Sequence, residues 1–225
     1  FDRIRRRTWI GLVLVMTPAL VLAGSRSSYF AAAAGVLILF VSYRRWQPTR
    51  PQLMAAAAVA SLALVAAALA ADWRTDVRGA AGRAVSLRSQ FSETTARMFA
   101  SSPVFGVGVG RYFTRSSEFM SAELRALYGN ENAHNYFAQQ FAELGVIGGL
   151  LFVWLAGAIV ARGWSAARML GGYDPALVGL FAGIAGYLLT CVTGHPLLVA
   201  EAALPFWITC GALVSVARDE GPVLL

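Results

Sequence analysis

The sequence predicts an all-α membrane protein: a polytopic bundle of about six transmembrane helices, with one long loop that contains interfacial helices. Of the 225 residues, 57% are hydrophobic and only 14% are charged, whereas soluble domains usually carry about 25% charged residues. Six apolar stretches are long enough, or nearly so, to cross a bilayer, which takes ~20 residues. They cover residues 8–24, 28–43, 52–71, 135–161, 174–193 and 198–217.

Short basic segments give these stretches an orientation. "DRIRRR" precedes the first stretch, "YRRWQPTR" follows the second, and Arg162 and Arg168 follow the fourth, so all three fall on one side of the membrane. Short arginine-rich loops stay in the cytoplasm. The opposite, outer side then receives the long loop at residues 72–134 and the turns at residues 25–28 and 194–196.

We expect one membrane domain over residues 1–225, with the outer loop at residues 72–134 inside it. Because the chain starts at Phe1 rather than at methionine, we expect it to be a fragment of a longer protein. The first apolar stretch, which lies between arginines and small residues, also fits a signal peptide. A second apolar stretch follows it at once, which favours a helical hairpin.

The outer loop begins with an amphipathic pattern. Apolar or small residues recur at helical spacing between residues 82 and 100, which predicts a helix lying at the membrane interface. These residues are Leu87, Phe91, Thr94 and Met98, and the charged residues elsewhere around the helix are Arg83, Arg88, Glu93 and Arg97. Pro103 ends the pattern, "SSPVFGVGVGRYF" predicts a glycine-rich turn, and residues 115–128 form a second, weaker helix candidate.

The charges of the chain favour lipid or an anionic substrate as its partner. All 19 basic residues are arginine, and the formal net charge is +7, which suits anionic lipid headgroups or phosphate. They are split between the loops of an apolar bundle, so nucleic acid is not expected. The two histidines lack the carboxylate pattern of a zinc site, and we expect no metal and no cofactor.

The stretch "GNENAHNYFAQQFAEL", residues 129–144, places polar residues at the start of the fourth apolar stretch. On a helix, Asn132, Asn135, Gln139 and Glu143 would form one polar stripe, which must face protein or water because lipid cannot satisfy it. Such a stripe can also simply join neighbouring helices. His134 lies off the stripe, and an imidazole that titrates near neutrality is suited to act as a general base.

Other residues could support a site on the outer side. Arg26 in "GSRSS" and Arg88 in the loop are candidates for binding a phosphate, although each could instead anchor the chain at the lipid headgroups. Glu131 would share a helix face with His134 if the helix has begun there. Arg111, Asn135 and His195 are further candidates for supporting roles, with His195 otherwise a turn residue.

Three pieces of the chain, in this order and spacing, resemble the O-antigen ligase and polymerase superfamily. They are "GSRSS" at a hairpin tip, Arg88 shortly before "SPVFGVGVGRYF", and "AHNYFAQQFAELGVIGGLLF" at the entry of a span. The resemblance covers residues 20–160. It implies a multi-pass protein of the bacterial cytoplasmic (inner) membrane that takes a glycan from undecaprenyl pyrophosphate on its periplasmic side, without a metal ion.

The resemblance also implies roles for single residues. His134 matches the catalytic histidine, while Arg26 and Arg88 match arginines that bind the pyrophosphate. Ligation of O-antigen to the lipid A core is the favoured reaction, and the alternatives are polymerisation of O-antigen or exopolysaccharide and glycosylation of a protein hydroxyl. Two departures stand out: Phe91 lies where the family usually has a tryptophan, and the chain is about half the usual length.

Two other classes of function remain open at the level of sequence. A small-anion transporter could line its path with the polar stripe of residues 132–143, although no inverted repeat is visible. A structural membrane scaffold would need none of the candidate side chains. Uptake of a small anion by reconstituted vesicles, abolished by Glu143→Gln, would favour the transporter. The scaffold predicts that His134→Ala, Arg26→Ala and Arg88→Ala each leave surface glycan intact, whereas the transferase predicts its loss in His134→Ala.

Overall fold

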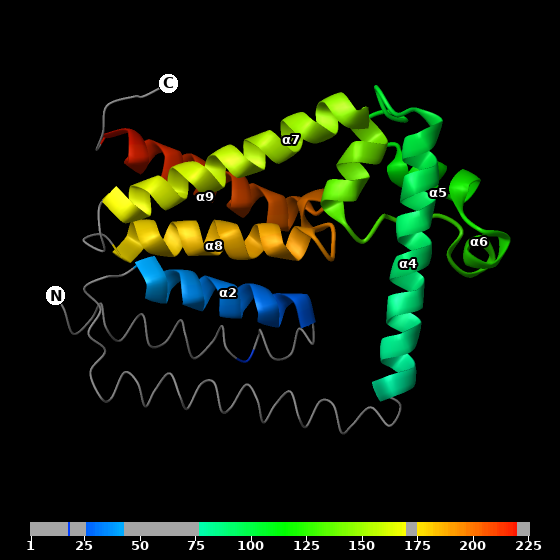
Figure 1. Cartoon of the computed structure of the whole chain (residues 1–225), viewed down its shortest axis with the longest axis horizontal. Helices are drawn as coiled ribbons and strands as arrows, with labels where there is room; N and C mark the ends of the chain where they lie inside the picture. The colour runs from blue at the N-terminus through cyan, green and yellow to red at the C-terminus, as the bar shows by residue number, and fades with distance from the viewer. Residues whose placement is uncertain (1–17, 19–25, 43–76, 170–174, 220–225) are drawn as a thin grey trace.

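The computed structural model describes residues 18, 26–42, 77–169 and 175–219, and within these residues every regular element is a helix (Figure 1). This confirms the all-α class for the described part. The apolar stretches predicted at residues 8–24 and 52–71 lie outside it, apart from residue 18. The helices are α2 (Arg26–Ser42), α4 (Val77–Ser101), α5 (Tyr112–Phe119), α6 (Ala122–Tyr128), α7 (Tyr136–Met169), α8 (Pro175–Cys191) and α9 (Ala200–Asp219), and a 3-10 turn, η1, covers Pro196–Leu198.

Four of the six predicted spans correspond to α2, α7, α8 and α9. By length and composition, α7 is the one described helix that can cross a membrane, over Tyr136–Ala167. Shorter apolar helices occupy Ser28–Ile38, Leu177–Cys191 and Ala200–Ser215. The bundle of about six spans therefore stays a prediction.

Helix α8 lies at the centre of the bundle and packs against α2, α7 and α9 (Figure 1). Its buried side chains Leu177, Phe181 and Ile184 follow helical spacing and face Leu213 and Phe206 of α9. A helix of this apolar character is buried by its neighbours on several sides, which makes α8 the rigid support of the turn that follows it.

Helix α4 runs across one end of this bundle, beside the short helices α5 and α6 (Figure 1). The predicted apolar face is confirmed, because Phe91, Thr94 and Met98 are buried, and Arg88 is exposed as expected. Tyr112 of α5 is fully buried against α4, and its hydroxyl lies 2.6 Å from Thr95 Oγ1. Burial raises the pKa of Tyr112 to about 12, so the hydroxyl keeps its proton and this hydrogen bond.

The second helix predicted in the loop is in fact two helices. The prediction placed one helix at residues 115–128, but α5 already begins at Tyr112 and the backbone becomes extended at Met120 and Ser121. Ser121 then caps α6, since its hydroxyl accepts a hydrogen bond from Leu124 N at 3.1 Å. The break lets Met120 and Leu124 pack around Phe91 of α4.

The apolar stretch predicted at residues 135–161 corresponds to α7, but α7 is broken at Gly145. This residue has φ 68° and ψ −170°, a conformation that essentially only glycine adopts. Residues 136–144 form a short first segment, and the chain then turns sharply into the long segment of residues 146–169 (Figure 1). Apart from Glu143, the run "AELGVIGGLL" is apolar on both sides of Gly145, so its hydropathy gave no sign of the break.

Candidate functional site

The break in α7 is filled by the glycine-rich turn of residues 102–110. Val107 N donates to Ala142 O and Gly108 N to Glu143 O, both at 2.9 Å, while Val146 N donates to Pro103 O at 2.8 Å. Carbonyl groups at the end of a helix have no partner within it. The turn therefore supplies the hydrogen bonds that the break takes away.

Two glycines make this close approach of backbones possible. A side chain at Gly106 would overlap the carbonyl of Glu143, and one at Gly145 would overlap the carbonyl of Val104. Both residues also have positive φ, at 72° and 68°. The glycine-rich turn predicted from the sequence is present, and main-chain hydrogen bonds fix it in place.

The carboxylate of Glu143 is a further anchor of the same turn. Glu143 is only 4% exposed, and a buried carboxylate needs hydrogen-bond donors around it. Its Oε2 accepts from Gly110 N at 2.8 Å, and its Oε1 accepts from Tyr112 N at 3.2 Å and from Gln139 Nε2 at 3.1 Å. Both oxygens are thus engaged by the protein itself.

The rest of the predicted polar stripe holds the segment before α7. Gln139 Nε2 also donates to Asn132 Oδ1 at 3.3 Å, and Gln139 Oε1 accepts from Ala133 N at 3.4 Å. Asn135 caps α7, because its Oδ1 accepts from Ala138 N at 3.0 Å. Asn132, Gln139 and Glu143 form a hydrogen-bonded series, which joins the segment before α7 and the start of α5 to α7. Asn132 itself precedes the helix.

His134 lies in this segment, two residues before α7 begins, and not on the helix. It has φ 52° and is the one residue other than glycine with positive φ in the part of the chain that the structure describes. Such a backbone costs about 1–2 kcal/mol for an L-residue and is often found at functional sites. The ring of His134 is half-buried and packs against Phe91, with 5.0 Å between ring centroids.

His195 packs against the same imidazole from the turn after α8. The two histidine rings lie 5.2 Å apart between centroids, and Tyr136 N donates to Gly194 O at 3.0 Å, which joins the two turns. The pKa of His195 is lowered, chiefly by burial and then by the neighbouring His134, while Glu131 opposes the shift. The lowered pKa favours the uncharged form of His195. The two histidines are far apart in the sequence, and the structure brings them together.

Glu131 is held by its own neighbours. Its backbone N donates to Ser116 Oγ at 3.0 Å, and its carboxylate accepts from Asn132 N at 2.8 Å. Because α7 begins only at Tyr136, Glu131 and His134 do not share a helix face, which corrects the expectation from their spacing. Glu131 acts on His195 through its charge, which raises the pKa of that imidazole.

The arginine candidates lie in three different places. Arg88 is exposed on α4, one turn before Phe91, so it belongs to the stretch of helix that contacts His134. Arg26 is the first residue of α2, and its side chain lies outside the described residues. Arg111 is exposed at the start of α5 with its aliphatic part over Gly108, and within the described ranges its guanidinium has no hydrogen-bond partner.

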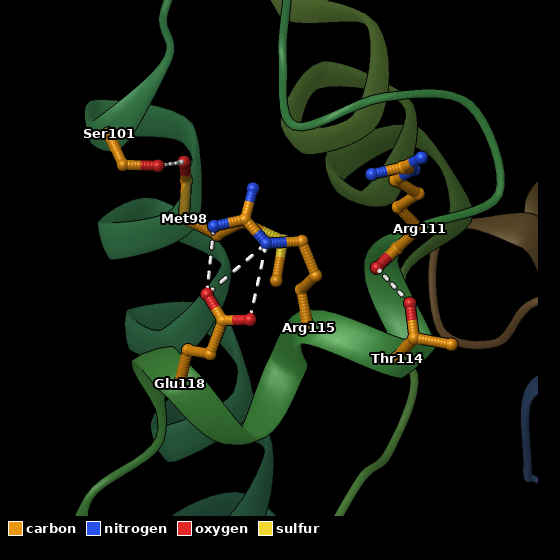
Figure 2. Close-up of polar contacts among 6 residues, drawn as sticks. All are labelled: Met98, Ser101, Arg111, Thr114, Arg115 and Glu118. Carbon is orange, nitrogen blue, oxygen red and sulfur yellow. Dashed lines mark hydrogen bonds and ion pairs between the residues drawn. The ribbon is translucent and has the colours of Figure 1, made fainter.

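Figure 2 shows how Arg111 differs from the next arginine along the chain. Arg115 points at Glu118 and binds it at 2.8 Å, whereas the Arg111 guanidinium extends away from that pair. Arg111 thus remains available to an anion, and Arg115 does not. Among the residues whose positions are described, no group of three or more His, Cys, Asp or Glu side chains could hold a metal ion.

One comparison with known proteins identifies the family. The family model described as O-Antigen ligase matches residues 11–153. The chain belongs to the O-antigen ligase family. No curated protein and no solved structure matches it. Membership of the O-antigen ligase family indicates a bacterial membrane protein, a glycosyltransferase of the ligase or polymerase type that acts on lipid-linked glycans.

The O-antigen ligase match contains Arg26, Arg88, Arg111 and His134, but ends within α7 and so leaves out His195. The structure brings His134 and His195 together, with Arg88 one turn of helix from the Phe91 contact. Sequence reasoning missed the roles of Tyr112 and of Gly145. The pair Gln139 and Glu143, shortly before Gly145, could have indicated these roles. A buried carboxylate requires hydrogen-bond donors, and the glycine-rich turn offers backbone amides.

The hydrogen bonds of Glu143 in this O-antigen ligase fold give a prediction about stability. In the Glu143→Gln variant, an amide NH₂ replaces one acceptor, so a buried backbone N–H is left unsatisfied at a cost of about 1–3 kcal/mol. We expect a lower melting temperature in detergent and faster proteolysis at residues 103–110. Glu118→Gln is the matched control, because Glu118 is exposed and should tolerate the change. Equal melting temperatures for the two variants would contradict the role of Glu143.

Proposed function

We propose that this chain transfers a glycan from undecaprenyl pyrophosphate to an acceptor hydroxyl on the periplasmic side of the inner membrane, with the lipid A core as the favoured acceptor. The observation that supports it is His134, held in a strained backbone conformation against Phe91 and the uncharged His195. An enzyme site is one of the few reasons to keep such strain. Polymerisation and protein glycosylation remain alternatives within the same family.

The reaction that this site supports is a direct displacement. A ring nitrogen of His134 takes the proton of the acceptor hydroxyl while the oxygen forms a bond to the anomeric carbon of the glycan. The bond from that carbon to the pyrophosphate oxygen breaks, and its electron pair stays on the pyrophosphate. Attack from the side opposite the leaving group inverts the anomeric configuration. Because His195 carries no charge, it does not oppose the positive charge that His134 gains.

The leaving pyrophosphate needs positive charge close to the site. Arg88 is exposed on α4, one turn from Phe91, and a guanidinium can bind two phosphate oxygens at once. In our proposal Arg26 acts together with it, and Arg111 supports them, since its guanidinium has no partner among the described side chains. Fixed cations at the point where negative charge develops stabilise the transition state.

Arg88→Lys tests this role through the geometry of the guanidinium. Lysine keeps the charge but loses the two parallel hydrogen bonds, so we expect glycan transfer to fall roughly 10-fold or more. The rate would be measured on purified protein with a lipid-linked donor. Arg97→Lys is the matched control, because Arg97 is exposed on the same helix and pairs with Glu93 at 3.4 Å. Full activity of Arg88→Lys would remove Arg88 from the site.

A deletion strain tests the function as a whole. Surface polysaccharide from the strain would be separated on a gel, with and without the complementing gene. Loss of all chains joined to lipid A, together with accumulation of lipid-linked polymer, supports ligation, whereas a single repeat on lipid A indicates a polymerase. Normal surface polysaccharide and normal protein glycosylation would contradict the proposal.

The break in α7 calls for a comparison with transport, since transporters bind substrates at broken helices. The sequence shows no pair of broken helices in corresponding places, and among the described helices the structure shows a break in α7 at Gly145. However, the carbonyls of Ala142 and Glu143 and the Glu143 carboxylate all accept hydrogen bonds from the glycine-rich turn. These groups are used within the chain, which favours a transferase over a transporter.

A further inference from the structure

The imidazole of His195 has a buried nitrogen without a hydrogen-bond partner among the described residues. This nitrogen is Nδ1. A buried polar atom without a partner lowers stability unless something outside the static fold engages it. His195 also lies beyond the residues that the family model matches, so the family match assigns it no role.

Backbone hydrogen bonds hold the main chain at His195 in place on both sides of the residue. Gly194 O accepts from Tyr136 N at 3.0 Å, and His195 O accepts from Leu198 N at 3.0 Å in the turn that opens with Pro196. The imidazole therefore stays beside His134, whose ring centroid is 5.2 Å away. A hydrogen bond between the two rings at this separation requires each ring to turn a nitrogen toward the other.

We propose that His195 is a positioning residue whose Nδ1 accepts a hydrogen bond from His134 once His134 has taken the proton of the acceptor hydroxyl. The inference rests on the proposed function. The proton leaves the hydroxyl oxygen and forms an N–H bond on His134, and that N–H or the opposite ring N–H of the imidazolium then donates to His195. No further reactant is needed, because the electron pair of the broken sugar–oxygen bond leaves with the pyrophosphate.

An uncharged His195 is required for this role. A charged imidazole carries a proton on both nitrogens and cannot accept a hydrogen bond. Burial of His195 and its closeness to His134 both favour the uncharged form, and the nearby Glu131 carboxylate acts in the other direction. A hydrogen bond to a charged group is stronger than one between neutral groups, so the contact becomes strong only after His134 has gained its proton.

Two substitutions separate this role from simple packing. His195→Asn keeps a hydrogen-bonding atom near the position of Nδ1 but removes the ring, whereas His195→Phe keeps a ring and removes the nitrogen. We expect kcat of His195→Phe to fall roughly 10- to 100-fold with little change in KM, the range for one lost hydrogen bond to a charged group. His195→Asn should recover most of the activity. A packing role predicts the reverse order.

The measurement is the initial rate of glycan transfer by the full-length protein in detergent or vesicles, with melting temperatures recorded for each variant. If His195→Phe fails to accumulate, His195→Gln replaces it, because glutamine mimics the other ring nitrogen and should stay impaired relative to His195→Asn. Equal rates for His195→Phe and the natural protein, or an Asn variant slower than the Phe or Gln variant, would overturn the inference. Loss of transfer in His134→Ala together with full activity in His195→Phe would overturn the inference about His195 and leave the proposed function intact. Full activity in His134→Ala would contradict the proposed function itself.

Discussion

Replacing His134 by alanine is expected to lower glycan transfer by about 10²- to 10⁴-fold, the usual contribution of a general base. The reason is that no other imidazole in the described part of the chain takes the proton in its place. In our proposal, the second histidine, His195, positions His134 and does not act as the base. Complementation of a deletion strain would show the loss as missing chains on lipid A. Initial rates with a purified lipid-linked donor would give its magnitude.

The backbone of His134 requires a control of its own. With φ at 52°, an alanine at this position is strained as well as lacking the imidazole. Asparagine tolerates the left-handed conformation better than alanine, so His134→Asn removes the imidazole with less strain in the backbone. We expect His134→Asn to be as inactive as His134→Ala and at least as stable. An active asparagine variant would mean that backbone conformation, and not the base, is what the site needs from this residue.

Replacing Gly145 by alanine is expected to have the largest effect on stability. The new Cβ would overlap the carbonyl of Val104, and the residue would keep a left-handed backbone that alanine disfavours. To avoid the overlap the glycine-rich turn must leave α7, which breaks the hydrogen bond from Val146 N to Pro103 O and exposes the contacts of Glu143. Together these losses amount to roughly 3 kcal/mol or more.

Melting temperatures in detergent and protease cleavage at residues 103–110 measure this effect. Gly157→Ala is the matched control on the same helix, because a Cβ there meets nothing within 4 Å. Alanine in a helix is better than glycine by about 0.5–1 kcal/mol, so the control should be unchanged or slightly more stable. If Gly145→Ala melts at the same temperature as Gly157→Ala, the break in α7 is not required by the fold.

The sequence predicted those features that depend on local pattern. The buried face of α4 followed from the spacing of Phe91, Thr94 and Met98, and the turn after it from Pro103 and the glycines. Patterns of this kind repeat every turn of a helix, so a single chain shows them. The choice of His134 and Arg88 came from the same stretches and from the resemblance, and they remain the candidates that the site is built around.

The features that the sequence did not predict depend on contacts between distant segments. Gly145 lies in a largely apolar run that also contains Gly148 and Gly149, so the sequence does not distinguish it. Glycine is required there because the carbonyl of Val104 lies where a Cβ atom would be. Besides Gln139, the donors to Glu143 are the backbone amides of Gly110 and Tyr112, and a backbone amide cannot be recognised from the type of residue that carries it. His134 and His195 meet because Tyr136 binds Gly194, a hydrogen bond between two turns that leaves no periodicity in either.

The glycine-rich turn is held by its main chain, and this has a consequence for how such proteins can diversify. Phe105 and Val109 are 76% and 79% exposed, and their side chains take no part in the hydrogen bonds that fix the turn. Evolution can therefore exchange these two side chains freely while the peptide groups and Gly106 keep the turn in place. The exposed surface of this turn can thus change while the hydrogen bonds beneath it stay the same.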